Sequence, residues 1–239
     1  MSLPSAETGL PLTLDHDLVD SVVEKVDTLR QQDPAGVRIM SRRAFSSILT
    51  HDESDLIESL YLLSPREIGI AMDAWTTHPE PMPDMFGLVR EAPHHIGHRV
   101  RMIQAQYVPL GPLAAYREMA SAIRHDGGGL LIGSSYRSDA YQAGIFLTRL
   151  RESGYSFDLT KQDVALPMNS EHTDLEHTAF DFVPERIQAH QHSYHSFQDS
   201  AEYEWLVRHA ALFGFTLSYP EGNPTGIKFE PWHWRFSGK

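Results

Sequence analysis

The chain has 239 residues, of which 41% are hydrophobic and 22% charged, the balance of an ordinary globular protein rather than of a disordered one. Its formal net charge of -12 argues against a nucleic-acid partner, because that binding depends on cations that face phosphates. The sequence contains no cysteine, which excludes disulfides and thiolate ligands, so any metal must be held by imidazole and carboxylate groups.

The amino-terminal residues 1–18 are acidic and contain prolines, and they lack the basic start and the apolar run of a secretory signal. No apolar run elsewhere approaches the roughly 20 residues that a membrane span requires. These features predict a cytoplasmic protein without a transmembrane segment. A trimmed start, non-standard export and release by lysis are the alternatives.

Apolar residues recur at helical spacing over 18–29 and 56–63, which predicts two helices. The sequence Ser-Pro-Arg-Glu at 64–67 is typical of a helix start and predicts a third helix towards Trp75. A proline cluster at 79–83 ends it, and residues 93–97 are expected to form a boundary loop. We therefore place a division near residue 95, with a helical N-terminal extension at 1–95 and a second domain at 96–239.

The second domain mixes helices and strands without regular alternation, which favours an α+β fold. The apolar runs and the capping residues predict helices over 113–124, 139–151 and 200–210, and strands over 130–132, 215–219 and 227–236.

Near the carboxyl end, residues 230–236 read E-P-W-H-W-R-F. In a strand their aromatic side chains would share a buried face, and His233 would point to the opposite face. Pro231 disfavours a central position in a sheet, so a bend there could bring the Glu230 carboxylate beside the His233 imidazole. A terminal strand with an incidental histidine is the alternative.

A carboxylate interrupts the otherwise apolar segment T-A-F-D-F at 178–182. Strand alternation places Phe180 and Phe182 on one face and Asp181 on the other. A buried carboxylate needs a cation or hydrogen-bond donors, and coordination of a metal by Asp181 and the nearby His172 would supply one. A surface edge strand with a solvated aspartate is the alternative.

The sequence G-S-S-Y-R-S at 133–138 follows the predicted strand 130–132, and Gln142 lies one turn into the next helix. At this junction Arg137 can bind a carboxylate or an oxyanion through a forked geometry that lysine cannot reproduce. A structural salt bridge of Arg137 is the alternative.

Together these three segments resemble, in the same order, the motifs of the VanY-type D-alanyl-D-alanine carboxypeptidases and of the related VanX-type dipeptidases. The family pattern is S-G-Y-R-S followed by a glutamine, then S-x-H-x-x-G-x-A-x-D, then E-P-W-H. The resemblance covers roughly residues 104 to 239. Ser135 replaces the glycine of the first motif, and the third motif matches in full.

The resemblance implies a small antiparallel sheet flanked by helices, the zinc D-Ala-D-Ala carboxypeptidase or Hedgehog-like fold. It implies that Zn²⁺ is held by His172, Asp181 and His233. In that scheme Glu230 takes the proton of the attacking water, and Arg137 stabilises negative charge on the substrate.

The resemblance also implies a substrate, a peptidoglycan stem peptide or another peptide that ends in D-Ala-D-Ala. Ser135, Tyr136, Gln142 and Ser170 are then expected to line the peptide site, although Tyr136 can equally be a packing residue. The interpretation leaves open D,D- or L,D-carboxypeptidase, D,D-dipeptidase and endopeptidase activity. A non-catalytic zinc-containing binding or signalling domain of the same fold is the alternative, and the presence of both Glu230 and His233 disfavours it.

The spacing between His172 and Asp181 departs from the family pattern, which places six residues between these ligands, whereas residues 173–180 make eight here. His177 is the alternative first ligand, because it shares strand parity with Asp181. The match at Ser170 favours His172. The longer loop is expected to alter access of the substrate.

Five further histidines invite a metal interpretation. His94 and His98 have a four-residue spacing, but a proline and a glycine interrupt any helix there, so we assign them to the boundary loop. His190, His192 and His195 fall in a polar stretch that is expected to be a solvated loop, with a second metal site as the lesser alternative.

Overall fold

The computed structural model describes residues 14–68, 78–187, 194–225 and 227–238. The described α-helices are α1 (His16–Gln32), α2 (Arg42–Ser46), α3 (His51–Leu62), α4 (Leu110–His125), α5 (Asp139–Glu152), α6 (Phe157–Asp163) and α7 (Ala201–His209). Short 3₁₀ turns are η1 (Gly36–Ile39), η2 (Pro65–Ile68), η3 (Pro83–Met85), η4 (Glu171–Thr173), η5 (Tyr194–Asp199) and η6 (Ala210–Phe213). The strands are β1 (Phe86–Val89), β2 (Ala92–Ile96), β3 (Arg99–Ile103), β4 (Gln106–Pro109), β5 (Leu130–Ser134), β6 (Ala179–Pro184), β7 (Arg186–Ile187), β8 (Phe215–Leu217) and β9 (His233–Phe236). Among these helices none is both long and apolar enough to cross a bilayer.

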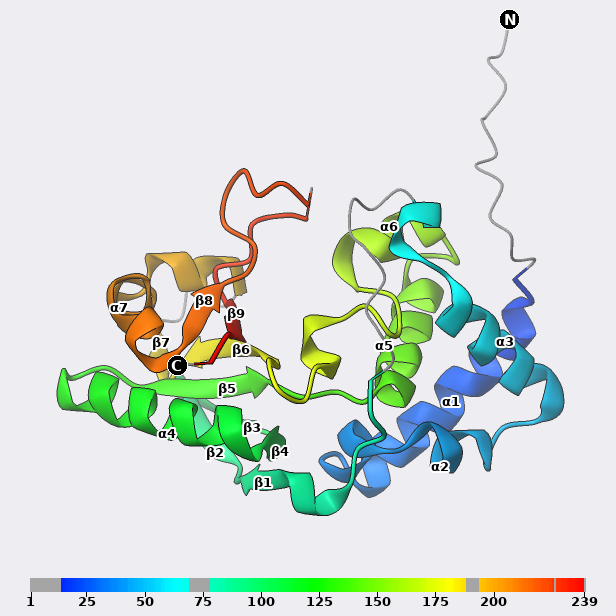
Figure 1. Cartoon of the computed structure of the whole chain (residues 1–239), viewed down its shortest axis with the longest axis horizontal. Coiled ribbons are helices and arrows are strands. Elements are labelled where there is room, and N and C mark those ends of the chain that lie inside the picture. The colour runs from blue at the N-terminus through cyan, green and yellow to red at the C-terminus, as the bar shows by residue number, and fades with distance from the viewer. Residues whose placement is uncertain (1–13, 69–77, 188–193, 226, 239) are drawn as a thin grey trace, which may run out of the picture.

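Two groups of elements lie side by side in the molecule. Figure 1 shows α1, α3, α5 and α6 on one side, and the sheet of β5, β6, β8 and β9 with α4 and α7 on the other. The chain crosses between them immediately after β5, where Ser138 caps the start of α5. The α+β class predicted from the sequence is confirmed.

The four-stranded sheet has the order β5-β6-β9-β8 and is antiparallel throughout. In its register Asp181 on β6 lies directly opposite His233 on β9. Asp181 is also opposite Ser134 at the end of β5, just after a register shift. Residues directly opposite in a sheet have closely spaced side chains, so the pairing brings the carboxylate and the imidazole together.

The sheet packs against α4 and α7 through a cluster of buried aromatic and aliphatic residues, here called the sheet core. Phe180 and Phe182 are both 0% exposed in it, and the Tyr116 ring from α4 stacks on both of them. Trp234 belongs to the same core, and Trp232 and Phe236 pack against its edge. The predicted alternation is therefore confirmed on both strands, and the core fixes the strands that carry Asp181 and His233.

A second cluster, the helical core, joins α1 and α3 to α5 and α6. The valines of α1 are fully buried against α5, where Gly144 permits a close approach. A Cβ atom at Gly144 would lie 2.8 Å from a methyl group of Val26. The helices that precede residue 95 thus share their core with helices that follow it. The division near residue 95 stays a prediction.

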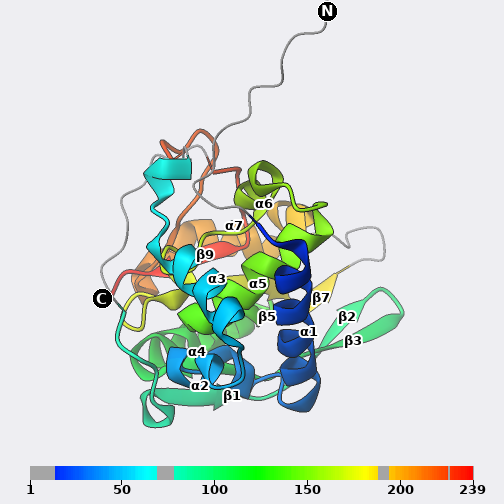
Figure 2. The same cartoon turned by 90° about the vertical axis from the view of Figure 1, so that its right-hand side faces the viewer.

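Residues 93–97 do not form the expected boundary loop. They belong to β2 and to the turn of a β2–β3 hairpin, which Figure 2 shows extending beyond the rest of the molecule. Pro93 is tolerated because β7 pairs only with His95 and Ile96, so β2 has a single neighbour at the proline. The turn follows β2 at Gly97, whose φ of 57° suits glycine.

The predicted helices at 18–29, 56–63, 113–124 and 139–151 correspond to α1, α3, α4 and α5, and the helix at 200–210 corresponds to α7 and η6. Gly214, with φ 80°, ends η6 as expected. The helix predicted after Ser64 begins as η2, and its remainder at 69–77 lies outside the described residues. The strand predicted over 227–236 is wrong before His233, because the chain turns at Pro231 and only β9 is extended.

Candidate active site

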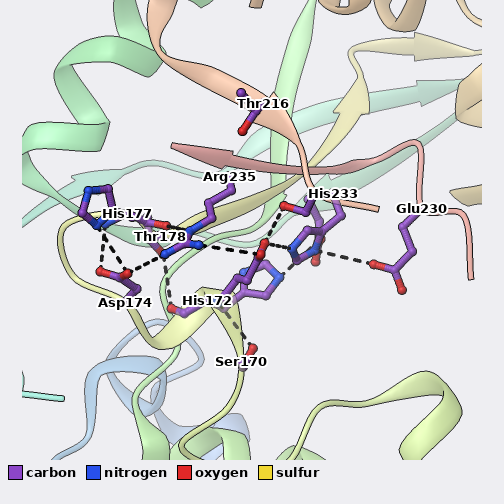
Figure 3. Close-up of polar contacts among 12 residues, drawn as sticks. Ser170, His172, Asp174, His177, Thr178, Thr216, Glu230, His233 and Arg235 are labelled. Atoms are coloured by element: carbon purple, nitrogen blue, oxygen red, sulfur yellow. Dashed lines mark hydrogen bonds and ion pairs between the residues drawn. The ribbon is translucent and has the colours of Figure 1, made fainter. Parts of the chain in front are cut away.

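Three buried side chains from distant parts of the chain meet beside the two central strands of the sheet. His172 comes from η4, Asp181 from β6 and His233 from the start of β9, and each offers a ligand atom within 4.8 Å of the other two. His172 Nε2 lies 3.4 Å from Asp181 Oδ1, and His233 Nδ1 lies 3.1 Å from the same oxygen. The two imidazole rings are nearly perpendicular, with centroids 4.9 Å apart. We call this set the His-Asp-His triad, and Figure 3 shows its two histidines facing each other.

Each imidazole is oriented through its second nitrogen. His172 Nδ1 donates to the backbone carbonyl of Ser135 at 2.9 Å, which leaves Nε2 facing Asp181. His233 Nε2 donates to Glu171 Oε2 at 3.0 Å, which leaves Nδ1 facing Asp181. Histidines that bind metals are held by such outer hydrogen bonds. Two imidazoles and one carboxylate are a ligand set that zinc uses in catalytic sites, so the donors present fit this ion.

The charges of the triad are strongly coupled. Burial, and then the positive charge of Arg137, lower the pKa of His172 to about 4. Burial opposes ionisation of Asp181, but His172, His233 and Arg137 together hold its pKa well below the ordinary value. Burial alone would lower the pKa of His233, but hydrogen bonds to Asp181 and Glu171 outweigh it and raise the pKa to about 10. The negative charge of Asp181 is therefore compensated by the cationic groups around it.

Glu230 lies beside the triad at the turn before β9. The His233 backbone N–H donates to the Glu230 carbonyl, which closes the turn, and the Glu230 Oε2 is 3.6 Å from His233 Nδ1. The bend expected at Pro231 is thus present (Figure 3). Burial raises the pKa of Glu230 to about 7. A carboxylate with a pKa near neutrality can both accept and return a proton.

Arg137 lies between β5 and α5 and contacts the triad directly. Its Nη2 donates to Asp181 Oδ2 at 2.9 Å, and its Nε donates to Ser134 Oγ at 3.0 Å. Its Nη1 is 3.4 Å from Gln142 Oε1, while Gln142 Nε2 donates to the Ala165 carbonyl at 2.8 Å. Gln142 therefore links the guanidinium of Arg137 to the α6–η4 loop.

A cavity of about 200 Å³ opens over the triad, and Arg137, Gln142, Ser170 and Glu230 line it. Ser135 and Tyr136, which the sequence suggested as substrate-binding residues, do not line it. The Ser135 hydroxyl donates to the Tyr107 carbonyl, and Tyr136 is 1% exposed and packs on Phe86. The turn after β5 points both side chains into the protein, where Ser135 supports the backbone and Tyr136 packs, so their assignment to the peptide site stays a prediction.

The long loop between His172 and Asp181 folds into a compact turn. Asp174 Oδ1 accepts from the backbone N–H groups of Glu176 and His177, and its Oδ2 accepts from Arg235 Nη2 at 2.9 Å. The ring of His177 is 44% exposed and lies next to Asp174, away from the triad (Figure 3). The structure thus brings His172, and not His177, to Asp181 and His233.

Within the described part of the chain, no other histidine belongs to the triad. His94 is buried on β2 and its Nδ1 donates to the Pro184 carbonyl at 2.8 Å, a structural contact. His98 lies in the β2–β3 turn. His190 and His192 lie outside the described residues, and His195 falls in η5.

Two residues at the site were not recognised in the sequence. Glu171 stands between Ser170 and His172 in the second motif, so its position was visible but its contact with His233 was not. Arg38 lies on η1, and its Nη1 reaches Ser134 Oγ at 3.4 Å. Nothing in the local pattern around Arg38 indicates this contact, because it is made with a residue almost 100 positions away.

A buried His-Asp-His triad with a carboxylate such as Glu230 beside it is an arrangement used by mononuclear metallohydrolases. The family model for VanY, described as D-alanyl-D-alanine carboxypeptidase, matches residues 93–239. The chain belongs to this family.

Similar proteins agree with this assignment. The chain is 35% identical over 105 residues to the bifunctional D-Ala-D-Ala dipeptidase and D-Ala-D-Ala carboxypeptidase VanXYC of Enterococcus gallinarum, covering 43% of this chain and 53% of that protein. It is 28% identical over 131 residues to a D-alanyl-D-alanine carboxypeptidase of Enterococcus faecalis, covering 51% and 45%. The solved structure of the LdcB LD-carboxypeptidase matches with 28% identity and a TM-score of 0.50, over 64% of this chain and 68% of that one. The chain spans about half the length of the curated relatives it matches.

Proposed function

We propose that this protein is a zinc-dependent carboxypeptidase that removes the C-terminal residue from peptidoglycan-type peptides, with D-Ala-D-Ala as the preferred end. The convergence of His172, Asp181 and His233 within 4.8 Å, with Glu230 beside them, is the observation that carries the proposal. The names of the family and of the similar proteins support the substrate class.

Zinc held by His172, Asp181 and His233 would act as a Lewis acid that polarises the scissile carbonyl and makes a water molecule more acidic. Glu230 faces the same cavity with a pKa near 7, so its carboxylate is suited to take a proton from the attacking water. The same carboxyl group can then pass that proton to the nitrogen of the leaving D-alanine. Each step needs the carboxyl group to change protonation state near neutral pH, which its burial makes possible.

Arg137 is placed to bind the negative charge that develops on the substrate. Three of its nitrogens are held by Ser134, Gln142 and Asp181, so the guanidinium is oriented before the substrate arrives. A fixed cation costs no reorganisation during the reaction and therefore stabilises the transition state efficiently. Gln142 acts on the substrate through Arg137, because both ends of its amide are already engaged.

The cavity wall suits a small apolar side chain. Val164, Ala165 and Leu166 line the cavity on the α6–η4 side, and Trp232 and Ile227 line it on the side of the turn before β9. A methyl group can be buried against such a wall. This composition supports alanine as the residue that is released.

The test compares purified zinc-loaded wild type with Glu230→Gln on a synthetic stem pentapeptide that ends in D-Ala-D-Ala. We expect the wild type to release D-alanine and the variant to be slower by roughly 10²- to 10⁴-fold, since it lacks the proton-transferring group. Metal analysis should show equal zinc in both proteins. A tetrapeptide that ends in L-Lys-D-Ala and free D-Ala-D-Ala distinguish the L,D-carboxypeptidase and dipeptidase activities.

Two histidine variants form a matched pair for the metal assignment. His172→Ala is expected to lose zinc and activity, whereas His177→Ala, on the same loop, is expected to retain both. If wild type and Glu230→Gln were equally inert while both held zinc, the hydrolytic proposal would fail in favour of a binding domain.

A further inference from the structure

A second cavity lies on the other side of Arg137 from the cavity over the triad. It measures about 540 Å³, and the residues that line both cavities are Arg137, Asp163, Val164, Asp181 and Trp232. Arg38 from η1 and Arg101 from β3 also line the second cavity. Arg38 precedes the region that the family model matches, so nothing in the family pattern accounts for it.

The guanidinium of Arg38 is largely unsatisfied. Its Nη1 donates to Ser134 Oγ at 3.4 Å, its Nε is buried without a hydrogen-bond partner, and within the described residues no carboxylate forms an ion pair with it. A guanidinium has five N–H donors and remains charged at neutral pH, and an unpaired buried charge is costly. Burial, together with the nearby positive charges of Arg137 and Arg30, lowers the pKa of Arg38, although Tyr141 and Asp181 oppose this effect.

Contacts of its backbone and of its side chain nevertheless fix the position of Arg38. Its backbone carbonyl accepts a hydrogen bond from Ser138 at the start of α5 at 2.7 Å. Its guanidinium lies 5.5 Å from the centroid of the Tyr141 ring, and Arg30 lies 5.1 Å from the same ring. Arg30 differs from Arg38 because it forms an ion pair with Asp27 at 3.1 Å. The two arginines on Tyr141 therefore share a packing role, but only Arg38 lines the cavity, and no carboxylate of the described residues forms an ion pair with it.

Two guanidiniums also converge on one hydroxyl group. Ser134 Oγ accepts from Arg38 and from Arg137, and the only carboxylate in contact with either arginine within the described residues is Asp181, which binds Arg137. Like charges this close repel each other unless an anion lies between or beside them. A carboxylate in the second cavity would satisfy Arg38 through the forked geometry that guanidinium groups favour.

We propose that Arg38 binds a carboxylate of the peptide substrate in the second cavity, so that the segment preceding the family region completes the substrate site. The inference rests on the proposed function, because a carboxypeptidase must recognise a free terminal carboxylate one residue from the scissile bond. Stem peptides can also carry carboxylates on their side chains. The shared chemistry is a peptide carboxylate, and the probes below separate the two sources.

The experiment measures binding by calorimetry to the zinc-loaded full chain in a Glu230→Gln background, in which hydrolysis of the probes is expected to be slow. The probes are N-acetyl-D-Ala-D-Ala, its C-terminal amide, and an amide of the same length with an upstream D-glutamate. Arg38→Gln is expected to weaken binding of the free acid by roughly 10- to 100-fold, as loss of a charge-assisted pair does. Binding of the plain amide should be unchanged, and Arg38→Lys should fall between.

Arg30→Gln is the matched control, because it removes the other guanidinium on Tyr141 without removing charge from the cavity. It should bind all three probes like its parent, and thermal unfolding should show that both variants are folded. Loss of affinity for the glutamate amide instead of the free acid would support the site and assign it to a side-chain carboxylate. Equal binding of both the free acid and the glutamate amide by Arg38→Gln and its parent, or no binding of any probe by the parent, would overturn the proposal. Inactivity of the wild type with Arg38-dependent binding intact would refute the hydrolysis and leave the carboxylate site supported.

Discussion

Replacing Glu171 by glutamine should weaken zinc binding although Glu171 is not expected to touch the metal. Its Oε2 accepts the Nε2–H of His233 at 3.0 Å and is itself held by the Ser218 hydroxyl, with its side chain only 11% exposed. The variant keeps the shape but removes the negative charge that makes the imidazole a better donor. Such outer partners change metal affinity by about 10- to 100-fold, which corresponds to about 1.4–2.7 kcal/mol.

The dissociation constant of zinc, measured by competition with a chromophoric chelator at neutral pH, tests this expectation. Asp174→Asn is the control, because Asp174 lies on the same loop and binds Arg235 but does not contact His233. If Glu171→Gln bound zinc as tightly as the wild type, or if Asp174→Asn weakened it equally, the orienting role of Glu171 would be refuted.

Three further predictions concern stability. Hydrogen bonds from Lys25 and Ser21 overcome the effect of burial and lower the pKa of Glu53 from 4.5 to about 2. Glu53→Gln should therefore cost at most about 3 kcal/mol of unfolding free energy at pH 7, and the difference from wild type should shrink as the pH falls from about 4.5 towards 2. Urea unfolding at several pH values checks this, and a difference that grows in acid would contradict it. Zinc at about 100 times its dissociation constant should raise the wild-type melting temperature by roughly 5–10 °C, and His172→Ala should show no such rise in a thermal scan. Phe182 is 0% exposed, so Phe182→Ala should lower the free energy of unfolding, measured in urea, by about 3–5 kcal/mol. A loss below about 1 kcal/mol would contradict the close packing of the sheet core.

The parts of the site that follow from local pattern could be predicted from the sequence. Alternation alone places Phe180 and Phe182 against the core and Asp181 opposite them, because side chains in a strand have a period of two. The proline before Trp232 indicated the bend that brings Glu230 to His233. These are properties of short segments, and the structure reproduces them.

Contacts between distant segments could not be predicted in the same way. Asp181 meets His233 because of the register of β6 and β9, which no single strand encodes. Ser135 stands where the first motif has glycine and was assigned to the peptide site, yet its hydroxyl turns towards the backbone of β4 beside the irregularity at the end of β5. Arg38 reaches Ser134 only because α1 and η1 pack on α5.

The close packing of α1 on α5 at Gly144 makes the position of the site residues depend on the stability of the helical core. Arg137 and Gln142 stand at the start of α5, while the apolar face of the same helix is covered by α1. A protein shortened to the family region would leave that face in water and would lose the support behind its own arginine. Substitutions in the segment that precedes residue 93 can therefore change the position of Arg137 and Gln142 without altering any residue of the three motifs.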